Sequence, residues 1–292
     1  MIEDIDGTMA VAHPLQWNCP VCGTSLQGQD RQLVCAQKHS FDIAKEGYVN
    51  LLPSHHKRSA DPGDDRHMLD SRRAFLARGY YQPLVENLVD WCTRLALEAG
   101  PPFAVLDTGC GEGYYTEAIA EAVVNALMPE QCWCGAIDIA RHAVRMAARR
   151  TRLVHYAVAS NAAIPLPSES IDCVLQIFAP GYAQEVLRIL KPGGWFIAVT
   201  PGPRHLQGLR RLVYDQPREH TPAATDSSDL RHVERFHLDF TIQVQGKQDV
   251  NNLLAMTPYF WQASRTKQAA IAALDVLDTD VSFIIDSYCR DE

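Results

Sequence analysis

Long hydrophobic runs are absent from this chain of 292 residues, and so is a net positive charge. No apolar stretch approaches the roughly 20 residues that a membrane-spanning helix needs, so we expect no membrane partner. Residues 1–14 lack the basic and apolar regions of a signal peptide, so we expect a disordered lead-in to a cytoplasmic protein. The formal net charge of −8 by itself argues against a nucleic-acid partner.

Apolar and basic residues are unevenly spread along the chain, however. Hydrophobic residues make up 47% of the sequence and charged residues 21%, which is enough apolar material for a sizeable core. Arg141, Arg145 and Arg149 follow one another at the spacing of one helical turn. They could contact the phosphates of an RNA, or they could form a solvated face of the helix. The same alternatives apply to Lys57, Arg58, Arg72, Arg73 and Arg150.

Three of the nine cysteines gather near the N-terminus, in a segment too small to fold on a hydrophobic core alone. The pair Cys19 and Cys22 and the pair Cys35 and His39 give the spacing C-x2-C-x12-C-x3-H. Two such pairs supply the four ligands of a tetrahedral zinc ion. A site in which all four ligands come from the protein is typical of structural rather than catalytic zinc. The alternatives are unrelated thiols and a redox Cys-x-x-Cys, which is disfavoured because the motif does not open a helix after a strand.

The rest of the chain alternates between short apolar strands and single helices. The expected strands are 103–107, 133–138, 153–158, 171–178, 195–200, 237–244 and 281–285. The expected helices are 67–79, 83–99, 114–126, 141–150 and 182–190. Strands separated by single helices predict an α/β fold, here a mostly parallel, seven-stranded, doubly wound sheet.

This pattern divides the chain into four expected segments. They are the lead-in (1–14), a zinc-binding module that recognises RNA (15–56), a linker with helices (57–100) and the α/β domain (101–292).

A glycine-rich loop, Asp107-Thr108-Gly109-Cys110-Gly111-Glu112-Gly113, follows the first strand of the α/β domain and opens a helix. Glycines allow a tight turn and the close approach of a ligand, while the helix N-terminus offers free N–H groups. The spacing is not the dinucleotide GxGxxG, because Tyr114 occupies the last glycine position. The Gly-Lys-Ser/Thr of a P-loop is also absent.

Two polar residues follow the next two strands in order. Asp138 closes one strand, where an acid can hydrogen-bond ribose hydroxyls, and Asn161 follows the other, where an amide could read adenine. Either could instead be a plain strand-end cap. With the glycine loop and the later Leu-Lys-Pro-Gly-Gly-Trp string, they resemble the Rossmann-like class I S-adenosylmethionine methyltransferases. The alternative is a nucleotide-binding α/β fold with another ligand.

More specific strings lie outside the glycine loop. They are the Cys₃His cluster, FDIAKEGYVNLL (41–52), DPGD (61–64), RAFL (73–76), YQPL (81–84) and TPGPRHL (200–206). With the glycine loop, they resemble the bacterial 23S rRNA guanine-N(1)-methyltransferases from about Trp17 to the last strand. The residues before Cys19 depart from this pattern, because they exceed what the zinc module needs.

The resemblance implies methylation of guanine N(1) in the helix 35 hairpin of 23S rRNA, at position 745 rather than 748. It also implies one structural Zn²⁺ ion per chain in a module that helps to recognise the hairpin. Tyr81, Gly111, Glu112 and His205 would contact S-adenosylmethionine, although Tyr81 could be a packed aromatic and His205 a helix cap. A homodimer that forms an RNA cleft is compatible with one small basic face per monomer.

We therefore assign two sets of site residues. The cofactor-binding set is Tyr81, Asp107, Gly109, Gly111, Glu112, Gly113, Asp138, Asn161 and His205. The metal-binding set is Cys19, Cys22, Cys35 and His39.

The acceptor side of the site is less well defined. The segment 178–180 follows the fourth strand and could stack on an unpaired guanine, or it could simply close the sheet. The N(1) proton must leave, but no residue stands out as a general base, so we assign no catalytic residue. Two other functions stay open: a methyltransferase for a metabolite or quinone, and a non-catalytic zinc protein that binds RNA.

Overall fold

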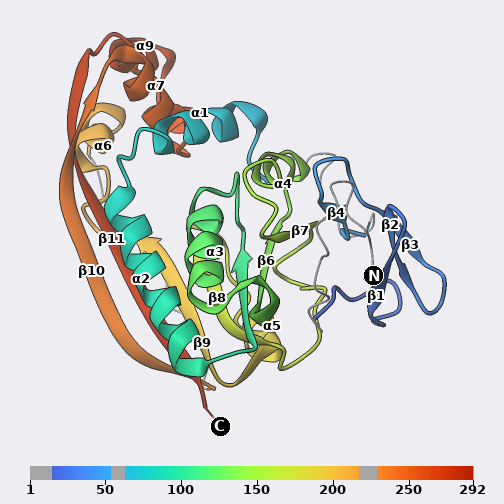
Figure 1. The fold of residues 1–292 in the computed structure, drawn as a ribbon. Coiled ribbons are helices and arrows are strands. Elements are labelled where there is room, and N and C mark those ends of the chain that lie inside the picture. The colour runs from blue at the N-terminus through green and yellow to red at the C-terminus, as the bar shows by residue number, and fades with distance from the viewer. Residues whose placement is uncertain (1–14, 54–62, 217–228, 292) are drawn as a thin grey trace.

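The protein is represented by a computed structural model that describes residues 15–53, 63–216 and 229–291 (Figure 1). The expected lead-in over residues 1–14 lies outside these ranges, as do Lys57, Arg58, Asp61 and Pro62. None of the helices within the described ranges is both long enough and apolar enough to span a membrane.

One large sheet forms the centre of the molecule, in the order β10-β11-β9-β8-β5-β6-β7-β4. Its strands are β4 (Val49–Asn50), β5 (Phe103–Thr108), β6 (Cys132–Asp138), β7 (His155–Val158), β8 (Ile171–Ile177), β9 (Leu190–Pro201), β10 (Leu230–Gln245) and β11 (Val276–Arg290). All neighbours from β9 to β4 pair in parallel, whereas β11 pairs antiparallel with both β9 and β10. The predicted α/β fold with a mostly parallel sheet is confirmed.

The predicted number of seven strands is wrong, because the described sheet has an eighth, β4. Val49 and Asn50 pair in parallel with Ala157 and Val158 of β7. Two residues are too few to give the alternation that marks a strand in a sequence. The antiparallel strands β10 and β11 are also much longer than predicted. Most side chains of β10 are exposed at the edge of the sheet, so this strand lacks a strong apolar pattern.

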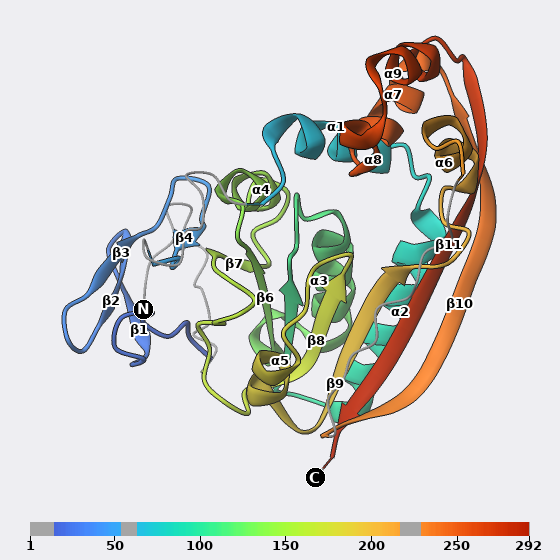
Figure 2. The ribbon, with the colours of Figure 1, turned by 180° about the vertical axis from the view of Figure 1, so that it is seen from behind.

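The helices cover the sheet and gather at one of its ends. They are α1 (Arg66–Leu76), α2 (Gln82–Ala99), α3 (Tyr114–Leu127), α4 (Arg141–Ala147), α5 (Ala183–Ile189), α6 (Gln207–Val213), α7 (Lys247–Ala255), α8 (Tyr259–Gln262) and α9 (Arg265–Ala272). Leu84 and Leu88 of α2 are fully buried in the same core as Phe103 of β5. Figures 1 and 2 show α1 beside α7, α8 and α9, above the body of the sheet.

The N-terminal segment forms a separate sheet that docks on the large one. Strands β1 (Leu26–Gln29), β2 (Gln32–Cys35) and β3 (Ser40–Asp42) pair antiparallel, and β4 then joins the large sheet. Trp17 meets Trp133 of β6 edge to face, with 5.3 Å between ring centroids. The amide of Asn18 donates to the carbonyl of Pro165 at 2.8 Å. The division into segments at residues 56 and 101 stays a prediction, but the module is packed on the sheet.

The packing of Trp133 gives a stability prediction. Trp133 is only 2% exposed, so Trp133→Ala should lower the free energy of unfolding by about 3–5 kcal/mol, measured by urea denaturation of zinc-loaded protein. Leu97→Ala is the control, because Leu97 is 58% exposed and should contribute less than about 0.5 kcal/mol. Similar losses in the two variants would contradict the role given to Trp133.

Candidate functional site

Four metal-ligating side chains converge beside the small N-terminal sheet. The ligand atoms of Cys19, Cys22, Cys35 and His39 all lie within 4.8 Å of one another. Cys22 Sγ and Cys35 Sγ are 3.6 Å apart, and His39 Nδ1 is 3.3 Å from Cys35 Sγ and 3.6 Å from Cys19 Sγ. Around tetrahedral zinc with its usual bond lengths, two sulfurs stand about 3.8 Å apart, and a sulfur and a nitrogen about 3.6 Å. The four side chains therefore fit a zinc ion.

Each pair of these ligands is carried by a tight turn of the backbone. The amide of Gly23 donates to the carbonyl of Cys19, and the amide of Lys38 donates to the carbonyl of Cys35, both at 2.8 Å. The hydroxyl and the amide of Thr24 lower the pKa of Cys22 to about 6. This favours the thiolate, which is the form that binds zinc.

The second candidate site is a cavity of about 1010 Å³ beyond the carboxyl ends of β5, β6 and β8. The glycine loop, helix α1, segment 178–180 and segment 256–259 all line it. In open parallel sheets, ligands bind at this edge. All but one of the predicted cofactor residues line the cavity: Tyr81, Asp107, Gly109, Gly111, Glu112, Asp138, Asn161 and His205.

The exception is Gly113, which begins α3 with a φ of 86°. A Cβ atom at this position would stand 2.8 Å from the Cβ of Ala147 in α4. The glycine therefore allows close packing of α3 on α4, which is a reason independent of any ligand. Its predicted contact with the cofactor stays a prediction.

Hydrogen bonds from β6 hold the glycine loop in its curved path. The amide of Gly111 donates to Asp138 Oδ2 at 2.9 Å, and the amides of Gly109 and Cys110 donate to the carbonyl of Ile137. Asp138 Oδ1 accepts from the amide of Ala140 at 2.8 Å. Each carboxylate oxygen keeps a further lone pair for a ligand, so Asp138 is both a strand-end cap and a lining residue.

Asp107 carries a buried carboxylate at the floor of the cavity. The residue is 3% exposed, and its Oδ2 accepts from the hydroxyl of Thr116 at 2.5 Å. Its Oδ1 has no hydrogen-bond partner among the described residues. Burial raises the pKa of Asp107 to about 7. An unpaired buried carboxylate oxygen is costly unless a ligand satisfies it, and a cationic donor group suits it best.

Glu112 is also buried but is held by an ion pair. Arg150 Nη2 lies 2.5 Å from Glu112 Oε2, and Arg150 Nη1 lies 2.8 Å from Glu117. Glu112 Oε1 has no hydrogen-bond partner in the described part of the chain. Burial raises the pKa of Glu112, and the guanidinium of Arg150 opposes only part of this effect. One carboxylate oxygen is thus fixed by the protein and the other is left for a ligand.

The remaining predicted residues complete two walls of the cavity. Asn161 lines the cavity, and its Nδ2 donates to the carbonyl of Pro180 at 3.1 Å. Tyr81 and His205 come from distant segments, yet the Tyr81 hydroxyl lies 3.5 Å from His205 Nε2. Phe178 stacks on His205 and has a positive φ of 54°. A bulky residue in this left-handed region is strained, a condition often found at functional sites.

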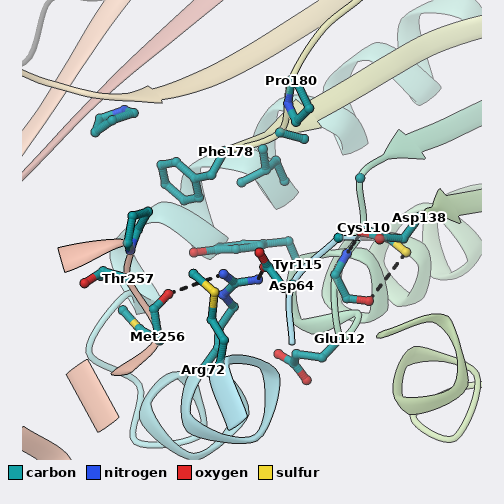
Figure 3. Close-up of a pocket in the computed structure, with 18 of the residues that line it drawn as sticks. Asp64, Arg72, Cys110, Glu112, Tyr115, Asp138, Phe178, Pro180, Met256 and Thr257 are labelled. Atoms are coloured by element: carbon teal, nitrogen blue, oxygen red, sulfur yellow. Dashed lines mark hydrogen bonds and ion pairs between the residues drawn. The ribbon is translucent and has the colours of Figure 1, made fainter. Parts of the chain in front are cut away.

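Sequence reasoning missed part of the cavity. Tyr115, whose buried hydroxyl has no partner among the described residues, projects across it. Met256, directly after α7, and Tyr259 of α8 also line it. The position of Tyr115, two residues after the glycine loop, is the only signal in the sequence. The sequence suggests a phosphate contact or a solvated helix face for Arg72, but Figure 3 shows it in the cavity beside Asp64.

Two arginines of the segment after β6 contact the N-terminal module. Helix α4 ends at Ala147 and is shorter than predicted, so Arg149 and Arg150 follow it in a turn. Arg149 pairs with Glu46 at 2.7 Å, and Arg141 donates to the hydroxyl of Tyr48. These arginines therefore tie the N-terminal module to the large sheet, a role that the helical spacing did not predict.

Two protein families match this chain in order. The zinc-ribbon family described as "RlmA, N-terminal" matches residues 17–60, which contain the Cys/His cluster. The family described as "Methyltransferase domain" matches residues 105–194, which contain the glycine loop, Asp138 and Asn161. The zinc module and the donor domain, predicted from different motifs, are thus both found.

Three curated relatives extend the match beyond these domains. The 23S rRNA (guanine(748)-N(1))-methyltransferase of Streptomyces fradiae is 38% identical over 194 residues, 65% of either chain. A Micromonospora griseorubida protein, provisionally named a 23S rRNA (guanine-N(1)-)-methyltransferase, is 32% identical over 88% of this chain and 90% of its own. A Bacillus subtilis protein with the same provisional name is 26% identical over 92% of this chain and 96% of its own.

These matches confirm the predicted methyltransferase class, with S-adenosylmethionine and zinc as its cofactors. The donor set around Cys22 and the unpaired carboxylate oxygen of Asp107 fit those two groups. The chain belongs to the 23S rRNA (guanine-N(1))-methyltransferase family.

Proposed function

We propose that this protein transfers a methyl group from S-adenosylmethionine to N(1) of a guanine in the helix 35 hairpin of 23S rRNA. The observation that carries the proposal is the packing of a zinc ribbon directly against the sheet that forms the donor cavity. The relatives named for this reaction align over most of the chain, including both parts.

The lining residues divide the cavity between donor and acceptor. We assign the donor's ammonium group to Asp107 Oδ1, its ribose hydroxyls to Asp138 and its adenine edge to Asn161. S-adenosylmethionine supplies an already activated methyl group, so the protein mainly positions the reactants. Phe178, 42% exposed, presents an aromatic surface on which an unpaired guanine could stack.

Three finer points stay predictions. The relative from Streptomyces fradiae is named for guanine 748, whereas we expect position 745 for this chain. A homodimer and a cytoplasmic location are also expected.

The reaction can be tested with purified protein, labelled S-adenosylmethionine and unmodified 23S rRNA. We expect label on one guanine N(1) of helix 35, mapped by primer extension and mass spectrometry. Label on a quinone or metabolite but not on rRNA would instead show a small-molecule methyltransferase. No binding of S-adenosylmethionine by calorimetry would indicate a non-catalytic zinc protein.

Gly111→Val tests the glycine loop. A side chain at Gly111 would enter the cavity, with Arg72 Nη1 3.7 Å from its Cβ. We expect S-adenosylmethionine binding to fall below detection by calorimetry while the zinc content stays at one ion per chain. Gly193→Val is the matched control: Gly193 also has a positive φ, but open space surrounds it. Unchanged donor affinity in Gly111→Val would show that the loop has another use.

Cys22→Ala tests the zinc site. Because the metal supplies much of the folding free energy of such a small module, loss of one ligand should release zinc and unfold the segment around it. Zinc can be counted by mass spectrometry of the metal, and unfolding followed by proteolysis. Cys289→Ala, a cysteine outside the cluster, should keep its zinc. Stoichiometric zinc in Cys22→Ala would refute the assignment.

A further inference from the structure

The donor cavity is lined by acidic groups and very few cationic ones. Asp64, Asp107, Glu112 and Asp138 all contribute to its lining. Arg72 is the only lysine or arginine among the described residues that line it. Glu112 is paired with Arg150 and Asp64 with Arg72, so the negative field comes from Asp107 and Asp138, which have no ion pair among the described residues.

This imbalance suits only part of S-adenosylmethionine. The sulfonium and the ammonium group are cations, which a negative cavity attracts. The α-carboxylate is an anion, and the carboxylates of Asp107 and Asp138 repel it. A bound donor therefore needs a local cation for its carboxylate, and the described lining offers one guanidinium.

Arg72 is fixed in place by both sides of the cavity. Its Nη1 lies 2.6 Å from Asp64 Oδ2, and its Nη2 donates to the carbonyl of Met256 at 3.3 Å. Figure 3 shows the guanidinium on one side of the Tyr115 ring, with Phe178 on the other side. A guanidinium has five N–H donors, and these two contacts use only two of them. Because it is already positioned, Arg72 can bind another anion with little further loss of side-chain entropy.

The position of Arg72 also matches the glycine loop. Its Nη1 lies 3.7 Å from the point where a Cβ on Gly111 would stand. The guanidinium therefore lies close to the loop at Gly111, and Asp107 lines the same cavity. An amino-acid group placed there would have its ammonium near a carboxylate and its carboxylate near a cation.

We infer that Arg72 binds the α-carboxylate of the methyl donor, an inference that rests on the donor site proposed above. Asp64 and the carbonyl of Met256 then act as positioning groups that aim the guanidinium. A planar guanidinium can take both carboxylate oxygens through parallel hydrogen bonds, which fixes the direction of the amino-acid chain as well as its charge. The alternative occupant is an RNA phosphate.

The test compares two ligands that differ only in the carboxylate: S-adenosylmethionine and decarboxylated S-adenosylmethionine. By calorimetry, wild-type protein should bind the decarboxylated ligand about 10- to 100-fold more weakly, the range for a charged hydrogen-bonded pair. Arg72→Gln should weaken S-adenosylmethionine by a similar factor and bind the two ligands about equally. Arg72→Lys, which keeps the charge but not the fork, should fall between.

Arg73→Gln is the matched control, because Arg73 is exposed on the same helix and outside the cavity lining. It should discriminate between the two ligands as the wild type does. Zinc content and circular dichroism check the fold of each variant, and Arg72→Lys replaces Arg72→Gln if the latter does not fold.

The outcomes separate the two proposals. If wild-type protein binds neither ligand, the donor site itself is wrong. If it binds both ligands equally, or if Arg72→Gln keeps the wild-type preference, the role of Arg72 is wrong. Unchanged donor affinity with a raised KM for rRNA would assign Arg72 to an RNA phosphate instead.

Discussion

The hydrogen bond from the amide of Gly111 to Asp138 is the contact on which the donor site depends. Parallel pairing of β5 with β6 brings the glycine loop and Asp138 to the same edge of the sheet, and this bond then fixes the curve of the loop. The curved loop lines the cavity at Gly109 and Gly111. Because these residues have no side chains, a ligand can approach the backbone there. Asp138 therefore shapes the loop as well as lining it.

The same edge of the sheet contains groups that are costly without a ligand. Asp107 keeps one buried oxygen unpaired, and Glu112 does the same despite its ion pair with Arg150. Such groups lower the stability of the empty protein, because burial of an unpaired carboxylate oxygen is unfavourable. A fold tolerates such unpaired oxygens when its other interactions are stable enough. A cationic ligand that pairs with them on binding removes their unfavourable contribution to stability. Burial of these acids is thus evidence about the charge of the ligand.

Features that depend on a few consecutive residues were predictable from the sequence. The glycine loop and the two zinc-ligand pairs can be recognised from the spacing of their residues, and both lie where the sequence predicts them. Features that depend on distant segments were not. Tyr81 and His205 are 124 residues apart and were assigned only by resemblance, and the contact between Arg72 and Met256 spans 184 residues. Helical spacing suggested a solvated or RNA-binding face for Arg141 and Arg149, but it could not show Tyr48 and Glu46 opposite them.

The eighth strand explains how a zinc ribbon can matter to a methyl transfer at a separate site. Val49 and Asn50 of the ribbon segment pair with β7, and Asn161 of the cavity follows β7 within three residues. The ribbon and the donor cavity are therefore joined through β7 of the large sheet. An RNA held by the ribbon would meet the cavity at a fixed position, and fixed geometry is the main contribution that an enzyme makes to the transfer of an activated group. A module joined to the cavity in this way would contribute to the positioning of the RNA.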